Sequence, residues 1–547
     1  MSVRLHIDSI VCDAPTGASV FDCAERAGVQ IPTSCRKNGR CKECVVEVVA
    51  GMERLSARAA PEAHLQGTYR LSCCAKIEAA EGDVTCHTMR RGTMRIERHA
   101  FELPVAAKNW HLEPAVTRDG DRILLDGVEI DRRVGPIHGI AVDIGTTTVV
   151  LRLLNLDTGE VVADASFENP QRFGGSDVMA RIHYDSNDRT RVLHRTLIGY
   201  LSRTIQELPI DPLSIYELVV AGNSTMRDMF FRLSVHSIGQ SPYQSVTEHD
   251  VAAGKRTTTS LSDTAQRLGL PIHPRARVYG LPIISGHVGA DAAACMLAID
   301  LAHEERTVAI MDIGTNTELI VGNRHKILAA SCPAGPAFEG GQITFGMPAL
   351  PGAIEKIAIA PDGSVSTEVL GGGAPIGICG SGLVELLGEL VRTERINALG
   401  RFEDGSHEFV VDARGDRPVT FSEADINFLA QAKGANVAGL RIAMGEYGTS
   451  FDALDVFYLA GGFGRHLNLD ASKRIGLIPN LDQRRILQVG NASVEGACIA
   501  LLSRSKRNEL EDLVRRVVHC RLETHPHFFD VFVEGCQFAP IDAAAPA

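Results

Sequence analysis

The feature that most constrains this chain is a group of cysteines near its N-terminus. Cys35, Cys41 and Cys44 follow one another with C-x5-C-x2-C spacing, in a stretch that begins at Ser34 and reads S-C-R-K-N-G-R-C-K-E-C. Cys73 comes later, on a separate segment. Three thiolates on one loop and a fourth on a distant segment can enclose a metal centre, and such a centre fixes the path of the chain between its ligands.

This spacing favours a [2Fe–2S] site of the plant type, in which a loop supplies three cysteines and a later strand the fourth. We predict that the ligands are Cys35, Cys41, Cys44 and Cys73. Counting alone does not separate Cys73 from Cys74, but the run Arg70-Leu71-Ser72-Cys73 resembles the R-L-A-C-like run of plant-type ferredoxins. A zinc site is the alternative use of four cysteines, and the spacing disfavours it.

The residues around the cysteines predict a small domain over 1–90. VRLHI alternates like a strand, a helix follows from about Ser19 to Ala27 with Ser19 as N-cap, and strands follow Cys44 and precede Cys73. This order resembles the β-grasp fold of plant-type ferredoxins.

The cluster loop is unusually basic for an acidic protein. Related ferredoxins often carry glycine beside the first two loop cysteines, whereas this chain has Arg36 and Lys42 there, with Lys37 and Arg40 nearby and Gly39 at a tight turn. This basic collar has three interpretations. It raises the reduction potential, it docks an acidic partner, or it is solvated loop charge.

Composition sets limits on the rest. The chain has 547 residues, too many for one core, so several domains are expected. No apolar run reaches the length of a membrane span and no secretory signal is visible, so we expect a cytoplasmic protein. A net charge of −12 argues against a nucleic-acid partner. Most of the other cysteines, including Cys12, Cys295, Cys498 and Cys536, are expected to be small buried side chains.

Residues 91–137 predict a linker or small connecting module. They contain Trp110 and a hairpin-like stretch in which Asp126-Gly127 is a favourable turn pair. Nothing in this segment indicates chemistry.

An internal repeat occupies the remaining chain. GIAVDIGTTTVVLRLL begins at Gly139 and TVAIMDIGTNTELIVG at Thr307, and each continues through a turn into a third strand. Each half also has a later strand that ends at glycine, in 217–226 and 456–464. We predict two α/β halves, 138–305 and 306–540, which resemble the acetate and sugar kinase, Hsc70 and actin (ASKHA) superfamily. The expected fold class is therefore multidomain, α+β and α/β.

In that superfamily the two Asp-x-Gly-Thr hairpins face each other across a cleft and bind the phosphates of ATP. Glycine lets the backbone approach a phosphate, and hydroxyl and N–H groups donate to it. The predicted phosphate-binding residues are Gly145, Thr146, Thr147, Gly314, Thr315 and Asn316. Asp143 and Asp312 are the predicted catalytic residues, holding Mg²⁺ directly or through water. Gly461, Gly462 and Gly464, in the turn Gly461-Gly462-Phe463-Gly464, resemble the adenosine motif.

Two further glycine-rich segments precede helices. Asp291 follows Ser285-Gly-His-Val-Gly-Ala. There are two hypotheses for it: a favourable charge at the helix N-terminus, or a group that positions water or metal. Cys379, before Gly380-Ser-Gly, is expected to be a packed thiol.

Taken together, these motifs resemble one family over nearly the whole chain: the reductive activators of corrinoid-dependent enzymes. The motifs are PTSC…GRCKEC, DIGTTTVV, Asn169-Pro170-Gln171, AGNSTM, GHVGAD, DIGTNTE, CGSGL, LAGGFG, VGNASVEGA and EGCQFAP. The resemblance implies that a [2Fe–2S] cluster passes one electron to the Co(II) of a corrinoid protein in a methyltransferase system, with ATP and Mg²⁺ making that step productive. It also implies an unidentified reductase as electron donor. A homodimer is a further expectation.

Three alternatives remain at this level. One is an activase of a radical dehydratase or aryl-CoA reductase, in which cysteines of the ATP domain bridge a [4Fe–4S] cluster between subunits. Another is a small-molecule kinase with an accessory ferredoxin. The last is an electron carrier with a degenerate nucleotide site.

Overall fold

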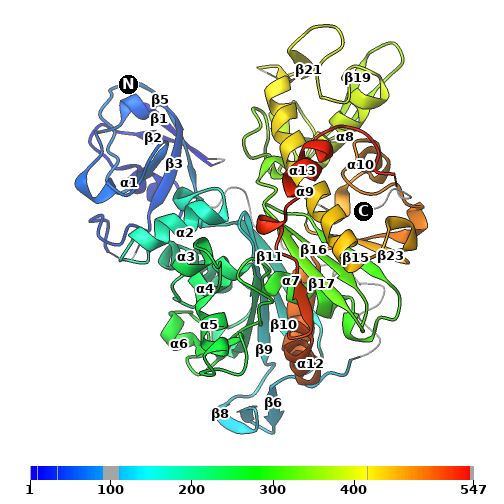
Figure 1. The fold of residues 1–547 in the computed structure, drawn as a ribbon. Helices are drawn as coiled ribbons and strands as arrows, with labels where there is room; N and C mark the ends of the chain where they lie inside the picture. Colours follow the sequence, from blue (N-terminus) through cyan, green and yellow to red (C-terminus); the bar gives the residue numbers. More distant parts are fainter. Residues whose placement is uncertain are drawn as a thin grey trace. The chain divides into compact units, whose positions relative to one another are not determined.

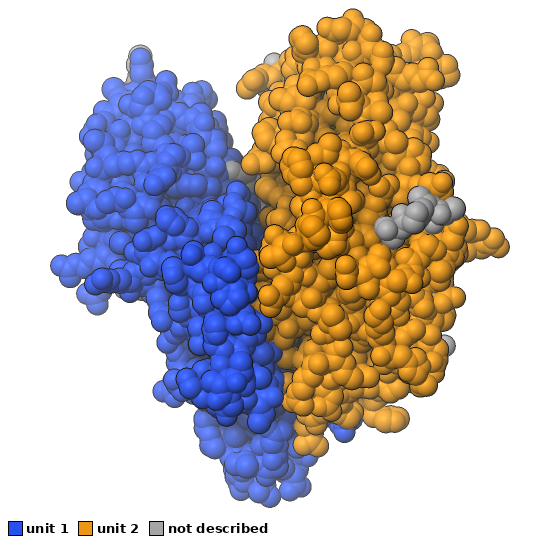
Figure 2. Space-filling model, in the orientation of Figure 1, with its two compact units in different colours: residues 1–100, 112–281 blue, residues 101–111, 282–547 orange. Residues whose placement is uncertain are grey.

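The structure is a computed structural model that describes residues 2–8, 10–33, 35–89, 110–415, 417–462 and 464–542. These residues form two compact units, the first made mostly of residues up to 281 and the second mostly of residues from 282 onward (Figure 2). Ser34, Phe463 and the first part of the predicted linker lie outside the described residues. No helix in the described ranges is long and apolar enough to cross a membrane.

The N-terminal residues fold around a mixed sheet with strand order β2-β1-β5-β3-β4 (Figure 1). β1 pairs antiparallel with β2 and parallel with β5. Helix α1 begins after Ser19, whose side chain accepts a hydrogen bond from the backbone N–H of Asp22, so the predicted N-cap is confirmed. The elements are β1 Val3–Ile7, β2 Ile10–Ala14, α1 Val20–Arg26, β3 Val45–Ala50, β4 Tyr69–Leu71 and β5 Gly82–Thr88.

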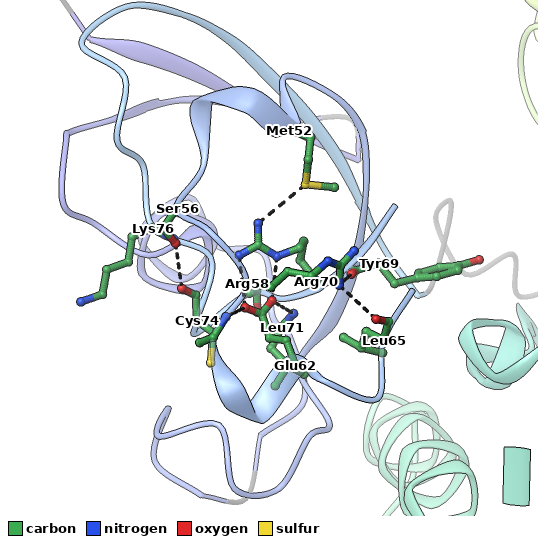
Figure 3. A network of polar contacts seen from close by, with 12 residues as sticks. Met52, Ser56, Arg58, Glu62, Leu65, Tyr69, Arg70, Leu71, Cys74 and Lys76 are labelled. Carbon is green, nitrogen blue, oxygen red and sulfur yellow. Dashed lines mark hydrogen bonds and ion pairs between the residues drawn. The ribbon is translucent and has the colours of Figure 1, made fainter. Parts of the chain in front are cut away.

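A buried ion pair supports the segment that carries the fourth cysteine (Figure 3). Glu62 is fully buried, and its two carboxylate oxygens accept from Nε and Nη2 of Arg70 at 2.7 and 3.1 Å. The same oxygens accept from the backbone N–H groups of Ala59 and Leu71 at 2.8 and 3.0 Å. Burial alone would raise the pKa of Glu62, but Arg70 and the two N–H groups hold it below its usual range.

Along the chain, a small antiparallel sheet follows the cluster domain and precedes the repeat. Its strand order is β6-β7-β8. Its strands are β6 Val116–Asp119, β7 Arg122–Leu125 and β8 Val128–Arg132. Asp126 and Gly127 join β7 to β8 with positive φ angles of 49° and 82°, as a type I′ turn requires. The predicted turn is therefore confirmed.

The repeat appears as two sheets with matching strand order. The first is β11-β10-β9-β12-β14-β13 and the second is β24-β23-β15-β16-β17-β25, so β9, β10, β11 and β12 correspond to β15, β16, β17 and β23. The strands of the first sheet are β9 His138–Ile144, β10 Thr148–Asn155, β11 Val161–Glu168, β12 Ile215–Gly222, β13 Leu261–Thr264 and β14 Arg277–Gly280. Those of the second are β15 Val308–Asp312, β16 Thr317–Gly322, β17 Ile327–Cys332, β23 Val456–Ala460, β24 Ile486–Gly490 and β25 Val517–His519.

A glycine brings the last of these matched strands against each Asp-Ile-Gly hairpin. Gly222 has φ 141°, and a Cβ there would lie 2.6 Å from the carbonyl oxygen of Ile144. Gly461 has φ 98°, and a Cβ there would lie 2.5 Å from the carbonyl oxygen of Ile313. Both positions therefore require glycine for conformation and for space, and the two halves share this detail.

Helices flank the sheets of both units. Those of the first unit are α2 Val178–Asn187, α3 Val192–Gln206, α4 Ser224–Phe230, α5 Val246–Ala252 and α6 Ala265–Leu268. Those of the second are α7 Ala290–Ala298, α8 Gly380–Arg392, α9 Glu423–Tyr447, α10 Leu469–Arg474, α11 Ala492–Leu502, α12 Arg504–Val514 and α13 Phe528–Gly535. Two small sheets, β19-β18-β20 and β21-β22, complete the second unit, with β18 Ala353–Ile359, β19 Val365–Val369, β20 Gly377–Ile378, β21 Glu408–Asp412 and β22 Val419–Ser422.

The boundary between the units falls at 281/282, whereas the sequence placed the change of half at 305/306. The difference is α7, which packs against α11 of the second unit. At Gly496 of α11 a Cβ would lie 2.0 Å from the carbonyl oxygen of Ala294. This close contact places α7 with the second unit although it precedes the second hairpin in the chain.

Glu62→Ala is expected to lower the free energy of unfolding of the cluster domain by about 3–5 kcal/mol, because it leaves the Arg70 charge buried without its partner. Calorimetry of the full chain would measure this. Glu53→Ala is the matched control, because Glu53 pairs with Arg54 at an exposed position.

The same pair predicts a pH dependence. The folded-state pKa of Glu62 is lowered, so its stabilisation is present above the unfolded-state pKa of about 4.3 and is lost as pH falls through the folded-state value. The wild-type protein should therefore lose more stability than Glu62→Gln on acidification below about pH 4.3. Equal pH profiles would contradict the assignment.

Candidate functional site

The cysteine loop brings its thiols together in two pairs. Sγ of Cys44 lies 3.3 Å from Sγ of Cys73. Sγ of Cys35 and Sγ of Cys41 lie 4.0 and 3.8 Å from the hydroxyl of Thr33. Two sulfurs on one tetrahedral metal, each bonded at ~2.3 Å, lie about 3.8 Å apart. The Cys44–Cys73 pair is close to this separation and suits one iron, and the thiols of Cys35 and Cys41, which both contact Thr33, suit a second.

Hydrogen bonds favour the thiolate form at this loop. Burial alone would raise the pKa of Cys35, but the N–H groups of Cys41 and Asn38, the Cys41 thiol and the Thr33 hydroxyl lower it to about 6. The hydrogen bond between Cys44 and Cys73 lowers the pKa of Cys44 and raises the pKa of Cys73. Thiolate is the form that binds iron, so these hydrogen bonds favour the iron-binding form at Cys35 and Cys44 but not at Cys73.

Three basic residues of the loop have left-handed backbone conformation. Arg36, Lys37 and Lys42 have φ angles of 54°, 66° and 61°, and Gly39 has 75°. Glycine is the residue that such angles favour. Arginine and lysine therefore hold this loop conformation at a cost in backbone strain.

The basic collar is partly neutralised. Nζ of Lys37 donates to Asp22 at 2.9 Å and to Glu25 at 2.7 Å, both on α1. Lys37 therefore ties the loop to the helix, which none of the three interpretations of the collar anticipated.

Cys74 lies beside the loop rather than within a close thiol pair. Its Sγ is 3.8 Å from Sγ of Cys73, and a Cβ at Gly39 would come within 3.1 Å of it. Cys73 is nearer to Cys44, at 3.3 Å. This arrangement favours Cys73 over Cys74 as the fourth ligand.

The two hairpins predicted to bind phosphate share one pattern of burial. In 143–147 and again in 312–316, the aspartate, the glycine and the last residue are half-buried, while isoleucine and threonine are buried. Asp143 is the last residue but one of β9, and Asp312 is the last residue of β15. Each aspartate therefore leaves the sheet just before a glycine turn, where carboxylate oxygens can reach a cation.

Side chains from neighbouring segments hold the first hairpin. Asn223 donates from Nδ2 to the hydroxyl of Thr146 at 3.0 Å, and it also caps α4. Asn169 donates from Nδ2 to the carbonyl of Gly145 at 2.8 Å and from its N–H to the carbonyl of Thr147 at 2.6 Å. The motifs AGNSTM and Asn169-Pro170-Gln171 thus shape the turn.

The second hairpin has its own internal partner. The hydroxyl of Thr315 donates to Oε2 of Glu339 at 2.5 Å. In this arrangement the hydroxyl hydrogen holds the turn in place and is not directed at a phosphate. Backbone N–H groups of the turn and Asn316 remain as candidate phosphate donors.

The three glycines of the turn after β23 have different surroundings. Gly461 lies against Asp312 and Ile313, Gly462 is exposed with open space at its Cβ position, and Gly464 is buried. The carbonyl of Gly464 accepts from Nε2 of Gln488 at 2.8 Å. An exposed backbone at Gly462 suits a flat base, as the resemblance implies.

Carboxylates around Asp312 were not predicted as a group. Glu318 lies directly opposite Asp312 in the β15–β16 ladder, is buried, and accepts from the Ser331 hydroxyl at 3.2 Å. Burial, and then the charges of Asp291 and Asp312, raise the pKa of Glu318 well above its usual value. A charged residue in the otherwise apolar strand TELIVG was the signal that could have revealed it.

Cys295, predicted to be a small buried side chain, also contacts this group. It is buried on α7, and its thiol donates to Oδ2 of Asp312 at 3.2 Å. Asp291 lies in the first turn of α7, where its Oδ1 accepts from the N–H of Ala292 at 2.8 Å. Cys379 is a packed thiol that contacts the Ser381 hydroxyl at 3.2 Å, as expected.

Comparison with known proteins follows the same division of the chain. Three family models match: a 2Fe-2S iron-sulfur cluster binding domain over 5–78, the RACo middle region over 138–304, and the C-terminal ASKHA domain of RACo over 306–546. The chain is thus an iron–sulfur protein fused to an ASKHA domain. It carries a [2Fe–2S] cluster and binds ATP.

Relatives narrow this class. The corrinoid activation enzyme RamQ of Eubacterium limosum is 30% identical over 448 residues, which are 77% of this chain and 73% of RamQ. The [Co(II) methylated amine-specific corrinoid protein] reductase of Methanosarcina barkeri is 23% identical over 73% of this chain and 76% of its own. A solved reductive activator for corrinoid, iron-sulfur protein superposes with TM-score 0.72 and 26% identity over 98% of both chains. The chain belongs to the family of reductive activators of corrinoid-dependent enzymes.

Serine substitutions would identify the cluster ligands. Cys41→Ser and Cys73→Ser should each abolish the [2Fe–2S] absorption and EPR spectra, because serine does not replace a thiolate ligand well. Cys74→Ser, the matched control, should keep both spectra. A spectrum that survives in Cys73→Ser but disappears in Cys74→Ser would reverse the assignment.

Proposed function

We propose that this chain is an ATP-dependent reductive activator. It transfers one electron from its [2Fe–2S] cluster to the Co(II) corrinoid of a partner protein and so regenerates Co(I). One observation carries the proposal. A chain related to RamQ over most of its length contains both the four predicted cluster cysteines and two Asp-Ile-Gly hairpins.

The role proposed for ATP follows from the energetics of the transfer. A downhill electron transfer needs no nucleotide, whereas transfer to an acceptor of lower potential needs a coupled favourable step. Nucleotide binding can supply it by changing the populations of the complex with the partner, and each 1.4 kcal/mol of bias changes a ratio about tenfold.

We assign the work to three parts of the chain: 1–90 for the cluster, 91–137 as connector and 138–540 for the nucleotide. In the last part Asp143 and Asp312 hold Mg²⁺, the two hairpins bind phosphate, and the turn at Gly461 and Gly462 receives the base. Glu318 joins this assignment as a buried acid beside Asp312.

The partners follow from the same chemistry. The acceptor is a corrinoid protein of a methyltransferase system, and a separate reductase refills the cluster. A cytosolic location agrees with cysteines that are thiols rather than disulfides. A homodimer remains part of the proposal.

The burial of the other cysteines supports a single cluster site at the N-terminus. An activase that bridges a [4Fe–4S] cluster between subunits needs exposed cysteines in its ATP domain. In the second unit Cys295, Cys332, Cys379, Cys498 and Cys520 are buried, whereas Cys536, which was also expected to be buried, is half-buried.

The decisive experiment mixes the chemically reduced protein with Mg-ATP and candidate Co(II) corrinoid proteins, and follows Co(I) by its visible absorption. The expected result is Co(I) formation that requires both the cluster and ATP. Phosphate transfer from ATP to a sugar or an acid, with no Co(I), would instead identify a kinase.

Asp312→Ala should lower ATP-dependent Co(I) formation on the order of 100-fold, because Mg²⁺ would lose a carboxylate. The [2Fe–2S] spectrum should be unchanged. Asp512→Ala is a control, because Asp512 pairs with Arg515 at an exposed position on α12, outside the hairpins. Normal activity of Asp312→Ala would contradict the Mg²⁺ assignment.

A further inference from the structure

The cluster loop rests on a helix of the first nucleotide-binding half, within the first compact unit. Arg195 of α3 donates from Nη2 to the carbonyl oxygen of Cys41 at 2.6 Å, and its Nη1 lies 4.0 Å from Oε1 of Glu43. Both partners belong to the loop that carries the predicted ligands. The nucleotide-binding half therefore supplies a group that contacts a cluster ligand.

The same face of α3 makes further contacts with the cluster domain. Arg203, two turns beyond Arg195, donates to the carbonyl of Gln30 at 2.7 Å. Gly199 lies between them, and a Cβ there would be 3.8 Å from Cβ of Pro32. These three residues form one stripe along the helix, so the contact is a continuous surface.

Other residues widen this interface. The hydroxyl of Tyr200 accepts from the N–H of Met89 at 3.2 Å. Arg172 pairs with Glu47 on β3 and with Glu168 at 2.6 Å. One hydrophobic cluster of buried residues includes side chains from both the cluster domain and the first half. The two parts thus dock as a packed pair.

We propose that Arg195 is a positioning residue for the [2Fe–2S] cluster, holding the ligand loop through the Cys41 carbonyl and keeping a positive charge beside it. The inference rests on the proposed function only in requiring that the cluster change its redox state. Its consequence is that the reduction potential of the cluster depends on a side chain from the nucleotide-binding half.

The physical argument is electrostatic. Reduction adds one electron to the cluster, so a nearby positive charge stabilises the reduced form and raises the potential. A guanidinium group is always protonated, so this charge is present at any working pH. Lys37 contributes less, because two acids, Asp22 and Glu25, lie within 2.9 Å of its Nζ, whereas the acid beside Arg195, Glu43, lies at 4.0 Å.

The hydrogen bond adds to this effect. A guanidinium that donates to the carbonyl of a ligand residue also fixes the loop, as the groups around a metal site commonly do. The side chain of Arg195 is 35% exposed, so solvent screens part of its charge. A moderate effect on the potential is therefore expected.

The test is a mediated redox titration of the full-length protein, followed by the EPR signal of the reduced cluster. Arg195→Gln should lower the ratio of reduced to oxidised cluster at a fixed potential about tenfold, which for a one-electron couple is about 59 mV. Arg195→Lys should keep a potential close to that of the wild type, because it keeps the charge.

Arg203→Gln is the matched control, since it removes the same charge from the same helix face but contacts Gln30, away from the ligand residues. It should leave the potential close to the wild-type value. Arg267→Gln, at an exposed site on α6, controls for net charge.

An unchanged potential in Arg195→Gln would overturn the proposal. An equal decrease in Arg195→Gln and Arg203→Gln would also overturn it, because docking in general would then set the potential. The titration uses no corrinoid protein and no ATP, so its outcome is separate from success or failure of Co(II) reduction.

Discussion

The close approach of a glycine to a neighbouring carbonyl is the constraint on which the nucleotide-binding part depends. Gly222 and Gly461 let β12 and β23 end directly against Ile144 and Ile313. A side chain at either position would push the strand end away from its hairpin. Because Asp143 and Asp312 precede those isoleucines, the same contact determines where each carboxylate emerges from its sheet.

The sequence predicted the parts of the structure that are local or repeated. The N-cap at Ser19, the turn at Asp126-Gly127 and the matched strands of the two halves follow from short patterns, and the structure confirms them. Cross-strand and cross-domain contacts could not be predicted in this way. Glu318 meets Asp312 only through the register of β15 and β16, and Thr315 meets Glu339, which lies in a separate 3-10 helix, Ala337–Glu339.

The contacts of long side chains were the hardest to predict, because their partners lie far away in the sequence. Lys37 had three interpretations as part of a basic collar, yet it binds two acids on α1. Arg195 gave no signal at all, since its partner is a backbone carbonyl 154 positions away. A carbonyl has no residue identity that a sequence pattern could show.

That property of carbonyls has a consequence for the evolution of the fused chain. Arg195 and Arg203 bind the main chain at Cys41 and Gln30, so they read the path of the loop and not its side chains. Surface residues of the cluster domain can therefore drift without breaking these two bonds. A foreign domain with the same loop path would meet the same two arginines, but its surface would also have to match Arg172 and the shared hydrophobic cluster.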